Sequence, residues 1–424
     1  MEYFLVVFMA AFLVFVTYTG LGVRQANRLL PVLLLAFLTR LVVHVLVMRP
    51  RIIEYGGDNR TYLARAGEIA TYWRQSGFRF VTGDQIAAIH SMEVPCNLFA
   101  VVVYLCDGPA TLACTAVVAT LACLLCIVMY RFAQLIGASE RAAFRLFVVV
   151  AFLPALLVHT SDTFKDGINA FLVVTCLWLV ASNVKRFDVR KLLLMVPLLW
   201  TLWHVRPYMV FMCALPLVVG LSPMERKLSV RSVVVSTLLL VPLVVLLARM
   251  DGGASLTMLQ EQLELGQSES VRRANAGGGS GVLFEDGGDA WSALAPKLLY
   301  TLLAPFPWTP GSLTLQFGKV DTFIWYYLLY NALRGARRLW ARDRTLLFVL
   351  VLFIVPGTIA YATTMANIGL IFRQRMPIML IVSLLAALAW SATDPRERFR
   401  SALPRRAPDP VPPPQPAATP GTAR

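Results

Sequence analysis

A polar stretch between two long apolar runs, His159–Asn169 (HTSDTFKDGIN), carries the residue types best suited to chemistry. Lys165 and two acids, Asp162 and Asp166, lie there within one or two helical turns of apolar segments that are long enough for helices. Ionisable groups at membrane depth are costly, and they usually face a protein interior or a water-filled cavity. We therefore expect this stretch, including His159, to form part of a polar cavity at one face of a membrane.

Three acids are candidate catalytic residues. Asp58 lies in GGDNRTYLARAG, where the glycines let the backbone approach a ligand and the helix that follows offers free amides. Asp58 can serve as a general base or accept a hydrogen bond from a sugar hydroxyl, and it can equally be a helix N-cap. Asp162 and Asp166 form a set with Lys165, although acids near a helix N-terminus are also stabilised by its dipole.

Basic residues near these acids are candidate ligands for an anion. Arg60 and Arg65 can bind phosphate or extend to the membrane interface, where they would be solvated. Lys165 lies at the start of an expected helix, where a cation opposes the helix dipole, so we expect it, together with His159, to contact an anionic ligand. Arg206, in HVRPYM, has no charged neighbour in sequence, which indicates either an anion from elsewhere or an interfacial role.

Two further arginines, Arg373 and Arg375, lie in NIGLIFRQRMP just before the last expected span. They fall on the outer face, which should be poor in basic residues under the positive-inside rule. We therefore assign both to substrate binding.

The composition places these residues in a membrane. Of 424 residues 58% are hydrophobic and only 15% are charged, which is typical of a polytopic membrane protein. The net charge of +15 comes from arginines in short loops and in the tail, so it reports topology and not nucleic-acid binding. The seven cysteines fall in or at the ends of apolar runs, and the four histidines have no paired ligand spacing. We predict neither a metal site nor a cofactor.

The apolar runs predict an all-α polytopic transmembrane bundle of about eleven spans plus two re-entrant segments. The second span, Leu29–Met48, carries Arg40 and His44 four residues apart, on a face that should look into the bundle. The expected spans are 3–19, 29–48, 110–130, 142–158, 168–181, 189–203, 208–221, 232–248, 322–333, 346–364 and 376–390.

The two re-entrant segments are predicted from the lengths of the apolar runs and from the positions of the basic loops. Residues 94–106 are apolar but too short to cross, and residues 291–304 are stopped by three prolines in PFPWTP. Only if both turn back do the basic loops, such as 131–145 and 334–344, fall inside. With that topology the unusual polar residues at the span ends all lie on the outer face.

The expected organisation is a transmembrane domain, residues 1–392, and a Pro/Arg-rich cytoplasmic tail, residues 393–424, with a disordered composition. Two outer-face loops, 49–93 and 249–318, belong to the first part. An N-terminal apolar run without a basic start indicates a retained span, not a removable signal.

The pieces GGDNRTYLARAG, PALLVHTSDTFKDGINAFL, HVRPYM, LLAPFPW and NIGLIFRQRMPI, in this order, resemble bacterial polytopic proteins of surface-polysaccharide assembly. These include O-antigen-polymerase-like (Wzy or EpsG type) proteins and the broader GT-C glycosyltransferases. The resemblance implies metal-independent or weakly metal-dependent sugar transfer from an undecaprenyl-(pyro)phosphate donor. It implies that Asp58 is the acid of the first large outer loop, and that Arg206, Arg373 and Arg375 are the outer-face arginines. The sequence departs from GT-C members in lacking a DxD pair at Asp58.

The expected function is therefore that of a membrane glycosyltransferase or polysaccharide polymerase at the periplasmic face of a bacterial inner membrane. Its partners would be a polyprenyl-linked glycan, the lipid bilayer and polysaccharide-assembly proteins. One alternative is a transporter or flippase for a lipid-linked or anionic substrate, which should show matching interrupted helices in two halves. Another is a non-catalytic membrane subunit of a polysaccharide-export complex, with the proline-rich tail as its docking element.

Overall fold

The computed structural model describes residues 1–52, 57–221, 264, 267–270, 282, 284, 287, 289–310, 313–364 and 367–391, and it contains helices and no strands over these residues. The α-helices are α1 (Glu2–Leu21), α2 (Val23–Val43), α3 (Asp58–Ser76), α4 (Glu93–Cys106), α5 (Thr111–Ile136), α6 (Glu140–Ala151), α7 (Pro154–His159), α8 (Lys165–Lys185), α9 (Val189–Trp203), α10 (Pro207–Leu221), α14 (Leu294–Leu303), α15 (Leu313–Arg342), α16 (Arg344–Thr363) and α17 (Ile368–Ser391). A π-helical turn, η1 (His44–Met48), continues α2, and a 3-10 turn, η2 (Ala87–Ile89), precedes α4.

Within the described residues, six helical segments are long and apolar enough to cross a membrane: α1, α2 with η1, α5, α8, α16 and residues Arg373–Ser391 of α17. Of the apolar window of α1 only 17% is buried, whereas 94% of the α17 window is buried. Helix α1 therefore presents its apolar surface outward, as a lipid-facing helix does, and α17 lies in the centre of the bundle. This is the polytopic all-α fold that the composition predicted.

The other expected spans are shorter or more polar than a full crossing. The predicted span 142–158 is divided into α6 and α7, because Pro154 cannot continue the hydrogen-bonded ladder of α6. The spans predicted at 189–203 and 208–221 correspond to α9 and α10, and the span predicted at 322–333 lies within the longer α15. The predicted span 232–248, most of residues 249–288 of the outer-face loop 249–318, and the tail 393–424 lie outside the described residues.

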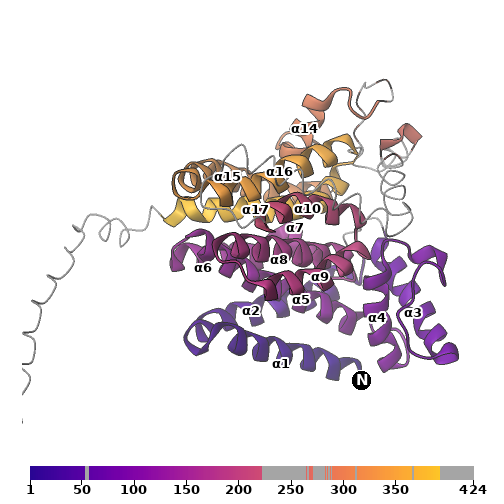
Figure 1. Ribbon diagram of the computed structural model, residues 1–424. Coiled ribbons are helices and arrows are strands. Elements are labelled where there is room, and N and C mark those ends of the chain that lie inside the picture. Colours follow the sequence, from indigo (N-terminus) through magenta and orange to yellow (C-terminus); the bar gives the residue numbers. More distant parts are fainter. Residues whose placement is uncertain are drawn as a thin grey trace, which may run out of the picture.

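Helices α3 and α4 lie side by side at one end of the bundle and run across the direction of α1, α2 and α5 (Figure 1). At that end the carboxylate of Glu2, in the first turn of α1, accepts a hydrogen bond from the backbone N–H of Leu112, at the start of α5. At the other end the carbonyl of Gly20 accepts from Arg131. Helices α1 and α5 are therefore parallel and α2 runs against them, so residues 49–110 leave and return at the same end. This agrees with the expectation that 94–106 does not cross.

The end opposite to α3 and α4 is rich in basic residues and has few acids. Arg28 pairs with Glu140 at 2.7 Å, Lys185 donates to the carbonyl of Leu135, and Arg342 donates to the carbonyl of Gly137. We call it the basic end, and the end with α3 and α4 the polar end. The positive-inside rule predicts that the basic end is the cytoplasmic one.

Helices α15 and α17 pack at very close distance. A Cβ atom on Gly335 of α15 would overlap the backbone carbonyl of Leu385 in α17. A glycine is therefore required for the two backbones to approach each other here.

Candidate functional site

Four charged side chains from distant parts of the chain meet at the polar end. Asp166, in the first turn of α8, bonds to the guanidinium of Arg206 and accepts from Nε of Arg373 at 2.9 Å. Arg373, on α17, also pairs through Nη1 with Oδ2 of Asp58 at 2.6 Å. We call these four residues the acid–arginine network. Buried charges persist when they are paired and hydrogen-bonded, and the side chain of Asp166 is 1% exposed.

Local structure explains how three of these residues are presented. Asp166 lies at the N-terminus of α8, where the helix dipole favours an anion. Arg206 lies in the short turn between α9 and α10, and Pro207 begins α10 because its fixed φ suits a first helical position. Asp58 follows Gly57, whose φ of 76° is in the left-handed region and turns the chain into α3.

Tyrosines complete the surroundings of the network. The hydroxyl of Tyr208 lies 3.1 Å from Nη1 of Arg206. Tyr62, one turn after Asp58 on α3, is buried, and its pKa is raised well above the usual tyrosine value by burial and by the nearby carboxylates of Asp58 and Asp166. Tyr62 is therefore a neutral hydrogen-bonding group at physiological pH.

A second acid, Asp162, is held in the turn between α7 and α8. Its Oδ2 accepts from the side-chain amide of Asn59 at 2.7 Å, and its Oδ1 accepts from the backbone N–H of Thr163 at 2.7 Å. Nδ1 of His44, at the start of η1, lies 3.8 Å from Oδ1. The hydroxyl of Thr163 donates to the carbonyl of Asn59 at 2.9 Å, so the turn is fastened to the first residues of α3.

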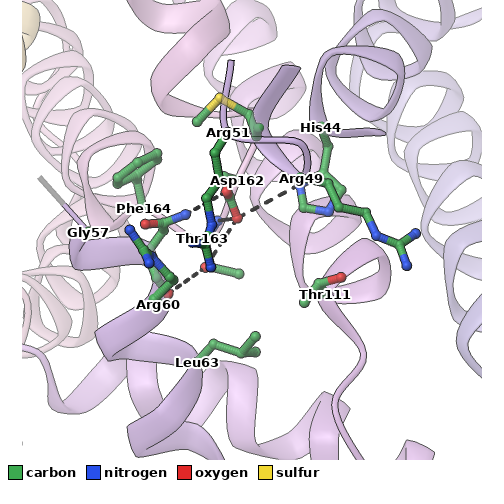
Figure 2. Close-up of a pocket in the computed structure, with 12 residues that line it drawn as sticks. His44, Arg49, Arg51, Gly57, Arg60, Leu63, Thr111, Asp162, Thr163 and Phe164 are labelled. Carbon is green, nitrogen blue, oxygen red and sulfur yellow. Dashed lines mark hydrogen bonds and ion pairs between the residues drawn. The ribbon is translucent and has the colours of Figure 1, made fainter. Parts of the chain in front are cut away.

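A pocket of about 180 Å³ opens beside Asp162. In Figure 2 the labelled side chains of Arg60, Leu63, Thr111, Arg49 and His44 are arranged around Asp162 and Thr163. Its lining residues are His44, Met48, Arg49, Arg51, Gly57, Asn59, Arg60, Leu63, Thr111, Asp162, Thr163 and Phe164. Asp58 lies between two of them in sequence, so the pocket and the acid–arginine network meet at the N-terminus of α3.

Two other predicted residues lie close by and have protein partners. Nζ of Lys165 donates to the carbonyl of Ser91 at 2.9 Å and lies 5.9 Å from the ring centre of Tyr62. His159 is buried at the end of α7, with its Nδ1 at 2.8 Å from the carbonyl of Ala155. Burial lowers the pKa of His159, which keeps the ring neutral, and the charge of Asp166 offsets this only in part.

Two predicted substrate-binding residues are engaged elsewhere. Arg65 pairs with Glu68 one turn along α3, at 2.6 Å. Arg375 is buried, and its Nη1 lies 3.4, 3.1 and 3.0 Å from the carbonyls of Thr301, Leu302 and Ala304. Arg375 thus satisfies carbonyl groups at the C-terminal end of α14, which have no partners within the helix.

Arg206 also differs from the sequence interpretation. The absence of a charged neighbour in sequence suggested an anion from outside the protein. The structure supplies that anion as Asp166, 40 positions away. Arg373 is similarly held by two carboxylates.

Several site residues were not identified as such from the sequence. Arg49 and Arg51 line the pocket directly after η1, and Asn59 and Thr163 fix Asp162. His44 was expected to face the bundle interior, together with Arg40, and both are buried there. Nε of Arg40 donates to the hydroxyl of Thr160 at 2.7 Å. In the sequence, the pair Arg40 and His44 on one face of an apolar helix was the signal that could have indicated this part of the site.

Over the part of the chain that the structure describes, no group of three or more His, Cys, Asp or Glu side chains is arranged to hold a metal ion.

No protein-family model and no curated protein matches the sequence. Among solved structures the chain is similar to the archaeal oligosaccharyltransferase AglB from Archaeoglobus fulgidus, in complex with an inhibitory peptide and a dolichol-phosphate. The two are 13% identical with a TM-score of 0.48, over 88% of this chain and 51% of the other. The chain thus spans about half the length of that protein.

Proposed function

We propose that this chain is a membrane glycosyltransferase or polysaccharide polymerase that uses sugars linked to polyprenyl (pyro)phosphate, at the periplasmic face of a bacterial inner membrane. The observation that carries the proposal is the accessibility of Asp58. Its side chain is 40% exposed, whereas those of Asp162 and Asp166 are 9% and 1% exposed. A general base must reach the proton that it removes, and Asp58 is the most exposed of these three acids.

The other two acids have positioning roles in this proposal. Asp166 is bonded to two arginines and holds them beside Asp58. Asp162 is fixed by the side-chain amide of Asn59 and by the backbone of Thr163, so it can orient a ligand in the pocket without moving. Fixed polar groups of this kind lower a barrier because they need no rearrangement during the reaction.

The proposed reaction transfers one sugar. A hydroxyl oxygen of the acceptor glycan attacks the anomeric carbon of the lipid-linked sugar, and the hydroxyl proton passes to the carboxylate of Asp58. The bond from the anomeric carbon to the phosphate oxygen breaks, and its electron pair remains on the phosphate. Arginines nearby stabilise that charge, since guanidinium groups bind phosphate oxygens well.

The resemblance to O-antigen-polymerase-like and GT-C proteins supports the choice of sugar transfer. Four of the five sequence pieces that carry it contribute a residue to the acid–arginine network, namely Asp58, Asp166, Arg206 and Arg373. The fifth, LLAPFPW, supplies two of the carbonyls that bond to Arg375. We propose that the chain belongs to one of these two classes, the O-antigen-polymerase-like proteins or the GT-C glycosyltransferases.

The decisive experiment is Asp58→Asn in cells that depend on this protein for their surface glycan. We expect a folded protein, halted chain growth and accumulation of lipid-linked repeat units, measured by mass spectrometry of extracted lipids. The matched control is Asp107→Asn, at the same end of the bundle, because Asp107 is an exposed acid that pairs with Arg74. Normal polymer length and yield in the Asp58 variant would contradict the proposal.

Reconstitution separates the remaining alternatives. Protein in liposomes with a labelled lipid-linked sugar and an acceptor should form a new glycosidic bond. Movement of the lipid-linked sugar across the bilayer without that bond would instead indicate a transporter. Glycan loss on deletion of residues 404–424, with Asp58 dispensable, would indicate a non-catalytic subunit.

A further inference from the structure

We propose that the pocket beside Asp58 binds a phosphate or pyrophosphate group through Arg49, Arg51 and Arg60. This assigns the phosphate subsite of the proposed function and rests on it. The sequence interpretation named Arg60 and Arg65 as possible phosphate ligands and assigned Arg206, Arg373 and Arg375 to the lipid phosphate as well. The contacts of the described residues favour Arg60 together with Arg49 and Arg51.

The arginines of the network are already neutralised. Arg206 and Arg373 face two carboxylates, those of Asp58 and Asp166, so the four charges balance. An anion that approaches this cluster must displace a carboxylate, and a buried ion pair is costly to break.

Arg49 and Arg51 are in a different situation. Both are exposed, line the pocket, and make no side-chain hydrogen bond or ion pair with any residue that the structure describes. They lie at the polar end, where the positive-inside rule disfavours arginine. Arg51 also has a φ of 61°, a left-handed conformation that is uncommon for a residue with a side chain. Free cations in this position are suited to an anionic ligand.

The π-helical turn explains why these residues reach the pocket. In η1 the N–H of Arg49 bonds to the carbonyl of His44 at 2.8 Å, and that of Ile52 bonds to the carbonyl of Val47 at 3.0 Å. These five-residue spacings widen the end of α2, and π turns are frequent at functional sites. His44, Met48, Arg49 and Arg51 all line the pocket as a result.

Helix α3 supplies the opposite wall. Gly57, Asn59 and Arg60 line the pocket from its first turn. The N–H of Arg60 donates to the carbonyl of Gly57 at 3.1 Å, so the N–H groups of Asp58 and Asn59 are the ones without a partner inside the helix. Such a terminus favours an anion through its free N–H groups and its dipole. The third arginine, Arg60, therefore stands next to backbone donors.

The hydrogen bonds of the His44 ring give independent support for a ligand in the pocket. Its Nδ1 lies 3.2 Å from the carbonyl of Ser161, which can only accept, so we assign the proton to Nδ1. Nε2 is buried and has no hydrogen-bond partner within the described part of the chain, although His44 lines the pocket. A buried polar atom without a partner indicates that a ligand group or water completes the site.

Size and charge limit the ligand. A volume of about 180 Å³ is below the roughly 300–1,000 Å³ of pockets that enclose a whole drug-sized ligand, so only a headgroup fits. The described residues that line the pocket include three arginines and one carboxylate, Asp162, which already accepts hydrogen bonds from Asn59 and Thr163. The sugar would remain outside the pocket, next to Asp58.

The test measures binding to the full chain in nanodiscs with two probes, inorganic pyrophosphate and a polyprenyl phosphate in the disc lipid. The variant is Arg49→Gln with Arg51→Gln. The matched control is Arg24→Gln with Arg337→Gln, which removes the same charge from exposed arginines at the basic end. We expect the pocket variant to weaken binding about tenfold or more, as loss of one charge-assisted bond does, and the control to bind normally.

The two probes distinguish the sources of the phosphate. If both bind and both need Arg49 and Arg51, the pocket recognises the phosphate itself. If only the lipid binds with this dependence, the pocket recognises a lipid headgroup. If neither probe depends on these arginines, the proposal is overturned.

Failure of the proposed function gives a different pattern. The Asp58→Asn variant should bind both probes as tightly as the unmodified chain while glycan growth stops. Should binding depend on Arg49 and Arg51 while Asp58→Asn leaves glycans unchanged, the phosphate site stands and the transferase assignment fails.

Discussion

The guanidinium of Arg206 lies directly against the carboxylate of Asp166, and both side chains are almost fully buried, at 8% and 1% exposure. The pair joins the α9–α10 turn to the start of α8. With Arg373 as a second partner, Asp166 ties three separate parts of the chain together at the polar end.

Asp166→Asn should destabilise the protein by about 3–5 kcal/mol, because it leaves two buried guanidinium groups with half of their counter-charge. Thermal unfolding in detergent measures this. The double variant Asp166→Asn with Arg206→Gln should lose less than the sum of the two single variants.

The matched control for this cycle is Glu140→Gln with Arg28→Gln, a pair at the basic end with side chains 57% and 39% exposed. Exposed pairs contribute about 0–1 kcal/mol, so little change is expected. Additive losses at Asp166 and Arg206 would show that the two side chains do not interact.

Arg375→Met should loosen the end of α14 and leave the acid–arginine network intact. The substitution removes one donor from the carbonyls of Thr301, Leu302 and Ala304, although Leu302 keeps the indole N–H of Trp325, and the loss of a buried hydrogen bond costs about 1–3 kcal/mol. Hydrogen exchange of residues 294–304 should rise. Loss of glycan synthesis with unchanged stability and exchange would instead support the original assignment of Arg375 to substrate binding.

His159 should make stability depend on pH. Burial lowers its pKa below the ordinary value of 6.5, so the folded protein keeps the ring neutral where the unfolded chain binds a proton. The contribution of His159 to the free energy of unfolding is complete above about pH 6.5. It decreases as the pH falls below that value, by at most about 1.4 kcal/mol per pH unit. The unfolding temperature of His159→Gln should therefore fall less between pH 7.5 and 5.5 than that of the unmodified chain.

His90 provides the control for that experiment, because its side chain is 52% exposed. An identical pH dependence in the His159→Gln and His90→Gln variants would exclude His159 as its source.

Cysteine labelling should locate the two ends of the bundle. Phe78 and Phe187 are 69% and 53% exposed and lie at the polar and basic ends. In a Cys106→Ser background, a membrane-impermeant reagent should label Phe78→Cys in intact cells and label Phe187→Cys only after lysis. Equal labelling of both in intact cells would contradict the assigned topology.

The fold class could be predicted from composition, and the inward face of α2 from the spacing of Arg40 and His44. Helix α3, Asp58–Ser76, begins where the sequence predicted a helix after the glycines of GGDNRTYLARAG. Both signals are local, since they depend on residues within a few turns of each other.

The pairing within the site could not be predicted in the same way. Asp166 and Arg206 are distant in sequence, and a single sequence contains no signal for such a contact. The start of α17 was also misplaced: the last span was expected from residue 376, whereas α17 begins at Ile368. Arg373 and Arg375 are therefore within the helix, two residues and about 200° apart, and point to different partners.

The close contact between Gly335 and the backbone of Leu385 restricts how Arg373 can move. Helix α17 is locked to α15 by that contact and to α14 by Arg375, so it cannot slide or tilt without breaking both. Arg373 can then change partners only by rotating about its own side-chain bonds. Such rotations leave the helices in place, so this end of the protein can respond to a ligand without a movement of α17.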